Sequence, residues 1–140
     1  MKFICDASAR KSWFRLETEV EAEQESELMA HAVAKHFRRA RERAAGSYKP
    51  ASEVFIEQDI GREAHVQRSM PLFLTLRDGD GVALVTAMLP PDGQDQHGFR
   101  VIVVGKGNAD PYPAFGADIE ALGRHFGMTL DRDRCFPYAR

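Results

Sequence analysis

A glycine-flanked lysine marks the place where the sequence could best bind an anion. The segment is Gly105-Lys106-Gly107-Asn108, which follows an apolar run typical of a strand and precedes a helical pattern. Glycines let backbone N–H groups approach an anion closely, and the lysine and a nearby helix N-terminus add positive charge. The glycine spacing matches neither the mononucleotide nor the dinucleotide pattern. A plain tight turn is therefore the preferred interpretation, with a phosphate site as the alternative.

The order of elements around this segment suggests what such a site would serve. A hairpin, a single strand, the Gly-x-Gly turn and a helix follow one another, and this order resembles the acyl-coenzyme-A site of acetyltransferases of the GNAT type. The resemblance implies a ligand-binding or acyl-coenzyme-A-dependent transferase-like domain that uses residues 105–108 as its anion site. No strand is predicted after the last helix, so the likeness is an analogy of local order.

A second group of residues could bind phosphates through positive charge. The group lies in the second half of a helical pattern and consists of Lys35, Arg38, Arg39, Arg41 and Arg43. Such a cluster could contact nucleic acid or an acidic partner. Its members spread around the helix, however, and the glutamates between residues 21 and 27 would repel a nucleic acid. The preferred interpretation is a solvated helix end that complements the helix dipole, so we do not expect nucleic-acid binding.

Metal-binding patterns are weak in this sequence. Glu27 and His31 are four residues apart and could contact one metal from a helix, but no second pair with ligand spacing accompanies them. Asp78, Asp80 and Gly81 match only part of a calcium loop, because the later acidic ligands are missing. The sequence therefore predicts no metal and no cofactor, and it assigns no catalytic residue.

The composition is that of a folded globular protein. The 140 residues are 44% hydrophobic and 29% charged, with a formal net charge of −2, which demands neither nucleic acid nor an anionic membrane. No run reaches the ~18 apolar residues of a membrane span, and no secretory pattern is present. We therefore expect a cytoplasmic protein without membrane contact, in which Cys5 and Cys135 are unpaired thiols.

Hydrophobic periodicity predicts the elements of the first half. Alternating apolar residues predict strands over 2–5 and 14–20. Apolar residues at helical spacing predict one long helix over 21–45, which Gly46 would end. Residues 53–59 are expected to form a strand, and the following segment up to residue 70 fits either a helix or a loop.

The second half gives stronger signals. Two apolar runs over 72–77 and 82–89, joined by the turn Asp78-Gly79-Asp80-Gly81, predict a hairpin. A strand over 99–104 and a helix over 113–126 follow. The order β-β-α-β-β-β-β-α predicts a single α+β domain over 1–140, with an antiparallel sheet of about five to six strands and both helices packed on one face. The residues expected in the core are Leu74, Val85, Val103, Val33, Phe37, Ile119 and Leu122.

The two faces of the predicted hairpin differ in a way that suggests function. One face is wholly apolar, whereas the other presents Phe73, Val82 and Leu84 among polar side chains, with neither helix left to cover it. The segment over 61–70 could cover this face instead, which is the competing explanation. A two-fold partner commonly buries such a strip, so a homodimer is expected. The sequence therefore favours a non-enzymatic binding or assembly module that self-associates. The ligand-binding domain and the nucleic-acid binder described above are its alternatives.

Overall fold

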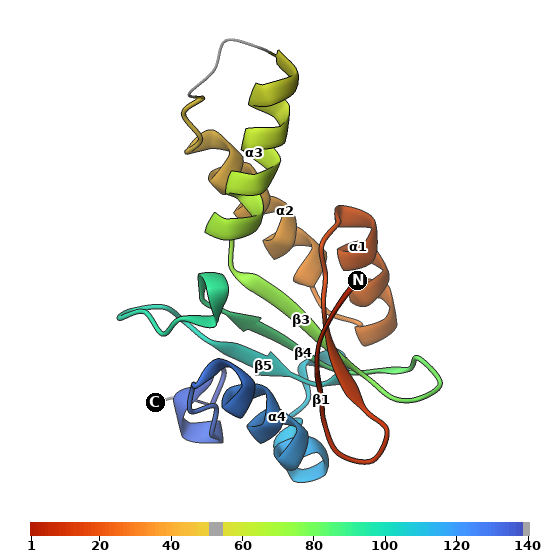
Figure 1. Ribbon diagram of the computed structural model, residues 1–140. Helices are drawn as coiled ribbons and strands as arrows, with labels where there is room; N and C mark the ends of the chain where they lie inside the picture. The colour runs from red at the N-terminus through yellow and green to blue at the C-terminus, as the bar shows by residue number, and fades with distance from the viewer. Residues whose placement is uncertain (51–54, 139–140) are drawn as a thin grey trace.

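The computed structural model describes residues 1–50 and 55–138 (Figure 1). Within them the chain forms an α+β fold with one five-stranded antiparallel sheet, as predicted. The strands are β1 (Lys2–Asp6), β2 (Ser12–Arg15), β3 (Leu72–Arg77), β4 (Ala83–Leu89) and β5 (Ile102–Val104). The α-helices are α1 (Glu19–Met29), α2 (Val33–Gly46), α3 (Phe55–Ser69) and α4 (Tyr112–Phe126). The short 3-10 turns are η1 (Pro91–Gly93), η2 (Lys106–Asn108) and η3 (Arg132–Arg134).

The sheet is a meander, in which each strand pairs with the next strand along the chain. β3 and β4 form the predicted hairpin, whose turn is held by the Asp78 carboxylate accepting from two backbone N–H groups. The register shifts between the pairs Leu76–Val85 and Arg77–Ala83, so Leu84 is the extra residue of a β-bulge. The bulge turns Leu84 toward the cluster on the α4 face, together with its neighbour Val85.

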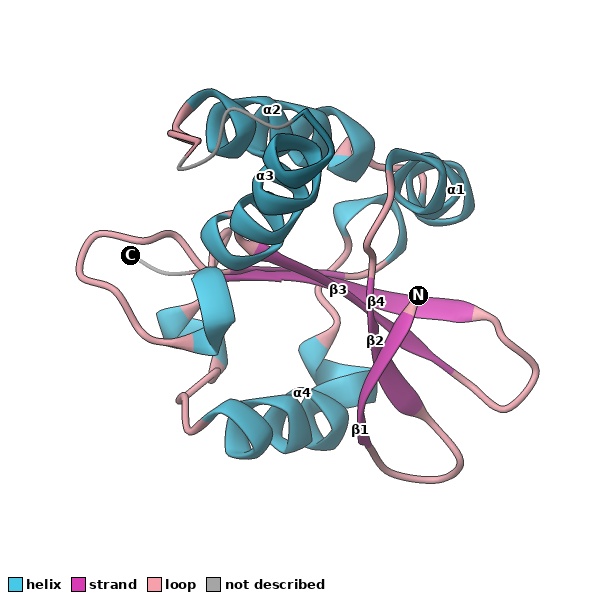
Figure 2. Cartoon of the chain, turned by 45° about the horizontal axis from the view of Figure 1, so that its top comes forward, coloured by secondary structure: helices cyan, strands magenta, loops and turns pink. Residues whose placement is uncertain are grey.

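Helices cover both faces of the sheet (Figure 2). α1, α2 and α3, which the chain inserts between β2 and β3, lie on one face, and α4 lies on the other. The expectation that both predicted helices share one face is therefore wrong. The second face of the sheet carries Leu16 and Phe73, which pack against Phe37 of α2, so it forms a core of its own. All seven residues expected in the core are buried: Leu74, Val85, Val103, Val33, Phe37, Ile119 and Leu122.

The predicted long helix over 21–45 is two helices. α1 begins at a capping box in which Thr18 and Glu21 bind each other's backbone, and it ends at Ala30, whose backbone is left-handed with φ of 52°. α2 begins at Val33. The apolar stripe continues across the break, because Met29 and Val33 keep the four-residue spacing and both are buried. The periodicity therefore gave no sign of the junction. The strand expected over 14–20 is also wrong beyond Arg15, because β2 is Ser12–Arg15 and Thr18 already caps α1.

The strand expected over 53–59 is also wrong in its described part. Residues 51–54 lie outside the described residues, and α3 begins at Phe55. A short apolar run cannot distinguish a strand from a helix, whereas Val66 and Met70 are spaced for a helix and are buried against α2 and the sheet. The described residues contain no helix that is both long and apolar enough to cross a membrane. Cys5 and Cys135 are unpaired, as predicted.

Candidate functional site

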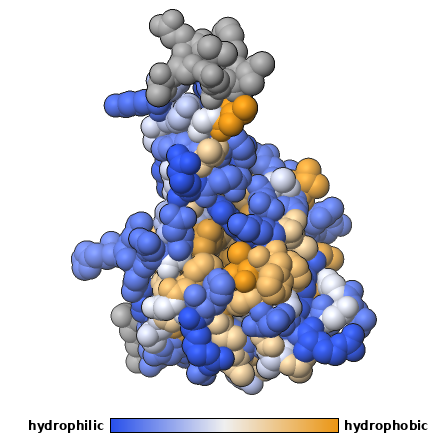
Figure 3. Space-filling view, viewed as in Figure 1, coloured by the Kyte–Doolittle hydropathy of each residue, from blue (hydrophilic) through white to orange (hydrophobic). Residues whose placement is uncertain are grey.

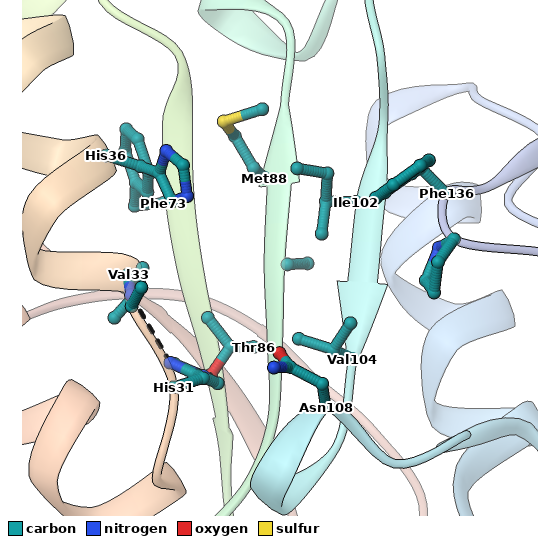
Figure 4. Close-up of a pocket in the computed structure, with 13 residues that line it drawn as sticks. His31, Val33, His36, Phe73, Thr86, Met88, Ile102, Val104, Asn108 and Phe136 are labelled. Atoms are coloured by element: carbon teal, nitrogen blue, oxygen red, sulfur yellow. Dashed lines mark hydrogen bonds between the residues drawn. The ribbon is translucent and has the colours of Figure 1, made fainter.

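An apolar groove of about 360 Å³ opens on the sheet face that carries α1 and α2 (Figure 4). One wall is the junction between α1 and α2, with His31, Val33 and His36. The floor is formed by β3, β4 and β5, and the opposite wall by the C-terminal segment at Phe136 and Pro137. Cavities of roughly 300–1,000 Å³ lined mainly by apolar side chains are typical of small-molecule sites.

The groove exists because the helices cover only part of this face. α1 and α2 pack over β2, β3 and the adjoining part of β4, which leaves the β5 side of this face open at Ile102 and Val104 (Figure 4). The C-terminal segment runs along β5 instead, where Phe136 donates its N–H to Val101 O at 2.7 Å and accepts from Val103 N–H at 3.2 Å. These bonds hold the Phe136 ring beside the groove.

A buried ion pair lies between α1 and the sheet, beside the part of the groove that Thr86 lines. Glu25 of α1 is fully buried, and its Oε1 accepts from Arg77 Nη2 at 2.7 Å. Its Oε2 accepts from the hydroxyl of Thr86 at 2.6 Å. Arg77 also donates through Nε to Thr75 at 3.0 Å. A buried carboxylate is tolerated only when its charge is paired and its lone pairs are bonded, and this one meets both conditions.

His31 connects this network to the groove. Its Nε2 lies 2.8 Å from the Thr86 hydroxyl, and its Nδ1 accepts from Val33 N–H at 3.4 Å. Because Nδ1 is an acceptor, the ring proton is on Nε2, which donates to Thr86 while Thr86 donates to Glu25. Burial lowers the pKa of His31, against the smaller opposing effect of the Glu25 charge. His31 is therefore neutral near pH 7.

This arrangement is suited to binding. The Thr86 hydroxyl is held between the Glu25 carboxylate and the His31 ring, and the residue is 4% exposed. No group of three potential metal ligands occurs among the described residues. The groove therefore offers apolar surface for burial and a few fixed polar atoms at its end.

The structure places the predicted anion segment beside this groove. Its residues form the turn after β5, in which Gly105, Asn108 and Ala109 donate their backbone N–H groups to carbonyls of the same loop. Because these three N–H groups already donate within the loop, fewer backbone donors remain to bind an anion. Both Asn108 and Lys106 are exposed, but only Asn108 lines the groove.

The basic group on α2 is partly neutralised. Arg38 forms ion pairs with Glu19 at 3.8 Å and Glu23 at 3.4 Å. Arg41 pairs with Glu63 of α3, which raises the pKa of Arg41. The remaining members, Lys35, Arg39 and Arg43, are exposed. Of the glutamates between residues 21 and 27, Glu23 pairs directly with this basic group.

The predicted interface residues are not brought together. Phe73 is 1% exposed, with its ring centroid 5.2 Å from that of Phe37. Leu84 packs partly buried toward the α4 face because of the bulge, and Val82 is 52% exposed. The three residues therefore form no common strip. Phe73 contributes to the groove instead.

Sequence reasoning missed the polar network. Glu25 was hidden in a series of alternating glutamates that is typical of a solvated helix face. The signal that distinguishes it is its spacing with Ala22 and Met29, since positions three and four apart share a helix face and all three are buried. His31 was paired with Glu27, but it lies beyond the end of α1 and contacts Thr86 instead.

Comparison with known proteins finds no match to any protein-family model, curated protein or solved structure. The function must therefore be argued from the geometry of the groove.

Proposed function

We propose that this protein is a non-enzymatic binding module whose groove takes a small apolar molecule. The observation that carries the proposal is the groove itself, an apolar cavity of about 360 Å³ in a face that is otherwise covered by helices. Burying an apolar ligand there removes from water both the ligand surface and side chains such as Met88, Ile102 and Phe136. The hydrogen-bonded network of Glu25, Arg77 and Thr86 keeps that end of the groove rigid.

The test uses an uncharged fluorescent probe, N-phenyl-1-naphthylamine. We expect saturable binding with one probe per chain. Ile102 lines the groove and is half-buried, so Ile102→Trp should fill the space and weaken binding at least about tenfold, or roughly 1.4 kcal/mol. Leu28→Trp is the matched control, because Leu28 is 51% exposed on α1 and does not line the groove.

Circular dichroism and thermal unfolding establish that both variants fold. Absence of saturable binding to the wild-type protein would refute the proposal. Equal loss of binding in Ile102→Trp and Leu28→Trp would show that the probe binds elsewhere.

We also propose that the protein self-associates as a homodimer, through a different surface from the one first expected. β1 is an edge strand of the sheet, so its outer backbone groups are available to a second chain. Figure 3 shows apolar side chains gathered over the region where β1 lies in Figure 1. Phe3 is 54% exposed there, and its ring packs edge-on against Phe14, with the two ring centroids 6.0 Å apart. The cytoplasmic location stays a prediction, supported by the two unpaired cysteines.

A further inference from the structure

The groove has a distinct polar end. His31, Thr86 and Asn108 lie at one end in Figure 4, and Met88, Ile102 and Phe136 lie toward the other. A ligand that fills the groove lengthwise would therefore place apolar atoms over the sheet and one polar group near Asn108. The identity of that group can be argued from charge and from hydrogen-bonding capacity.

The polar end carries no uncompensated charge. The Glu25 carboxylate beside it is paired with Arg77 and bonded to Thr86. His31 is neutral, because its Nδ1 accepts from Val33 N–H. A ligand carboxylate placed here would lose its hydration without gaining a cation and would face Glu25 through Thr86. A ligand ammonium would find both oxygens of Glu25 already occupied. The other titratable group of the lining, His36, is exposed at the opposite end, beside Phe73.

The free hydrogen-bonding capacity at this end belongs to Asn108. Among the described residues, its side-chain amide makes no hydrogen bond, and Figure 4 shows it pointing toward Thr86. An amide offers both a donor and an acceptor. The Thr86 hydroxyl has one lone pair left after accepting from His31 and donating to Glu25. The group that fits both partners is therefore one that donates and accepts at once.

We propose that the ligand is an apolar molecule carrying a single uncharged hydroxyl, which the Asn108 amide holds at the polar end of the groove. This inference rests on the proposed function of the groove and adds the chemical class of its ligand. The hydroxyl accepts from the Asn108 amide N–H and donates to an oxygen at the same end. The apolar body, of about two fused rings in size, lies over Met88 and Ile102.

Three matched competitors test the class of ligand against bound N-phenyl-1-naphthylamine near neutral pH. They are 2-naphthol, 2-methylnaphthalene and 2-naphthoate, which share one ring system and differ in the polar group. One hydrogen bond changes affinity by roughly twofold to tenfold. We expect 2-naphthol to bind about threefold to tenfold more tightly than 2-methylnaphthalene and also more tightly than 2-naphthoate.

The variant Asn108→Gly tests the residue. Asn108 has φ of 62°, a conformation that glycine adopts without strain, so the turn should keep its shape. In this variant the preference for 2-naphthol over 2-methylnaphthalene should fall below about twofold, with the affinity for 2-methylnaphthalene unchanged. Lys106→Ala, in the same turn but outside the groove, should behave as wild type.

The outcomes separate this inference from the function on which it rests. If the probe binds but 2-naphthoate competes as well as 2-naphthol, if no competitor displaces the probe, or if the 2-naphthol preference survives Asn108→Gly, the inference fails and the proposed binding function stands. If the probe itself does not bind in the groove, both fail.

Discussion

His31 couples the groove to the stability of the fold, because its ring bonds both the sheet and the start of α2. Burial lowers its pKa, so the unfolded chain binds the proton at a higher pH than the folded chain does. The stability that the neutral ring provides is complete above its ordinary pKa of about 6.5. It is lost as pH falls below that value toward the lowered pKa of the folded state.

We therefore predict that the free energy of unfolding decreases on acidification from about pH 7.5 to 5.5, a range above the titration of most carboxylates. His31→Gln keeps a donor that can reach Thr86 but does not titrate, so its stability should decrease less over this range. Urea denaturation of both proteins at each pH provides the measurement. Parallel pH profiles for the two proteins would show that His31 contributes nothing to the dependence.

At this scale the sequence identified the types of residue but not their partners. Asn108 was singled out for an anion, and the structure places it at the groove with its backbone N–H used inside the loop. Arg77 ends the first strand of the predicted hairpin, and its guanidinium pairs with Glu25 of α1, which is distant in the sequence. Such pairings depend on which helix lies over which strand. The type of a side chain does not indicate this arrangement.

Among the elements, α4 gives a sharp test of packing because it contains two glycines in different surroundings. A Cβ at Gly123 would lie 2.5 Å from the backbone oxygen of Met128, which cannot move easily. A Cβ at Gly116 would meet no atom within 4 Å. Both positions lie within α4, and Gly116 directly follows a kink at Phe115, where φ is −127°. Within a helix, alanine is intrinsically favoured over glycine by about 0.8–1 kcal/mol.

We predict opposite signs for the two substitutions. Gly116→Ala should stabilise the protein by up to about 1 kcal/mol through helix propensity. Gly123→Ala should destabilise it by roughly 1–3 kcal/mol, because overpacking against Met128 exceeds the gain in propensity. Thermal or chemical denaturation compares the two variants. A stabilised Gly123→Ala would mean that α4 does not approach residues 128–130 as closely as the structure has it.

The elements with strong local signals were predicted well, and those decided by tertiary contacts were not. The hairpin and α4 follow from turn chemistry and a clear apolar stripe. The break between α1 and α2 occurs where the stripe continues from Met29 to Val33, so no local pattern marks it. β5 is shorter than the expected strand over 99–104, since only Ile102–Val104 pairs with β4. The ends of a strand are set by where its hydrogen bonds to the neighbouring strand stop, and the residue types alone do not show this.

At the scale of the whole molecule, the edge of β1 is the surface that could bring two chains together. We predict a homodimer at micromolar concentration by size-exclusion chromatography with light scattering. Phe3→Lys should yield a monomer, because a lysine on an edge strand opposes pairing and removes the exposed ring. Val82→Lys, at an equally exposed apolar position in the β3–β4 turn region, is the control.

If the wild-type protein is a monomer at high concentration, the predicted homodimer is wrong. If Val82→Lys disrupts the dimer and Phe3→Lys does not, the interface lies at the β3–β4 hairpin and not at β1. Both variants change exposed side chains, so neither should unfold the protein.

The insertion of three helices between the neighbouring strands β2 and β3 has a consequence for how the chain reaches this structure. The β3–β4 hairpin is a local contact and can form within microseconds. Pairing of β2 with β3 must close a loop that contains α1, α2 and α3, so its entropic cost is larger and it is expected later. The groove needs β4 and β5 from one side of that loop and the α1–α2 junction from within it. A ligand of the proposed kind could therefore bind only after these parts have come together, and its binding would slow unfolding without speeding the first events of folding.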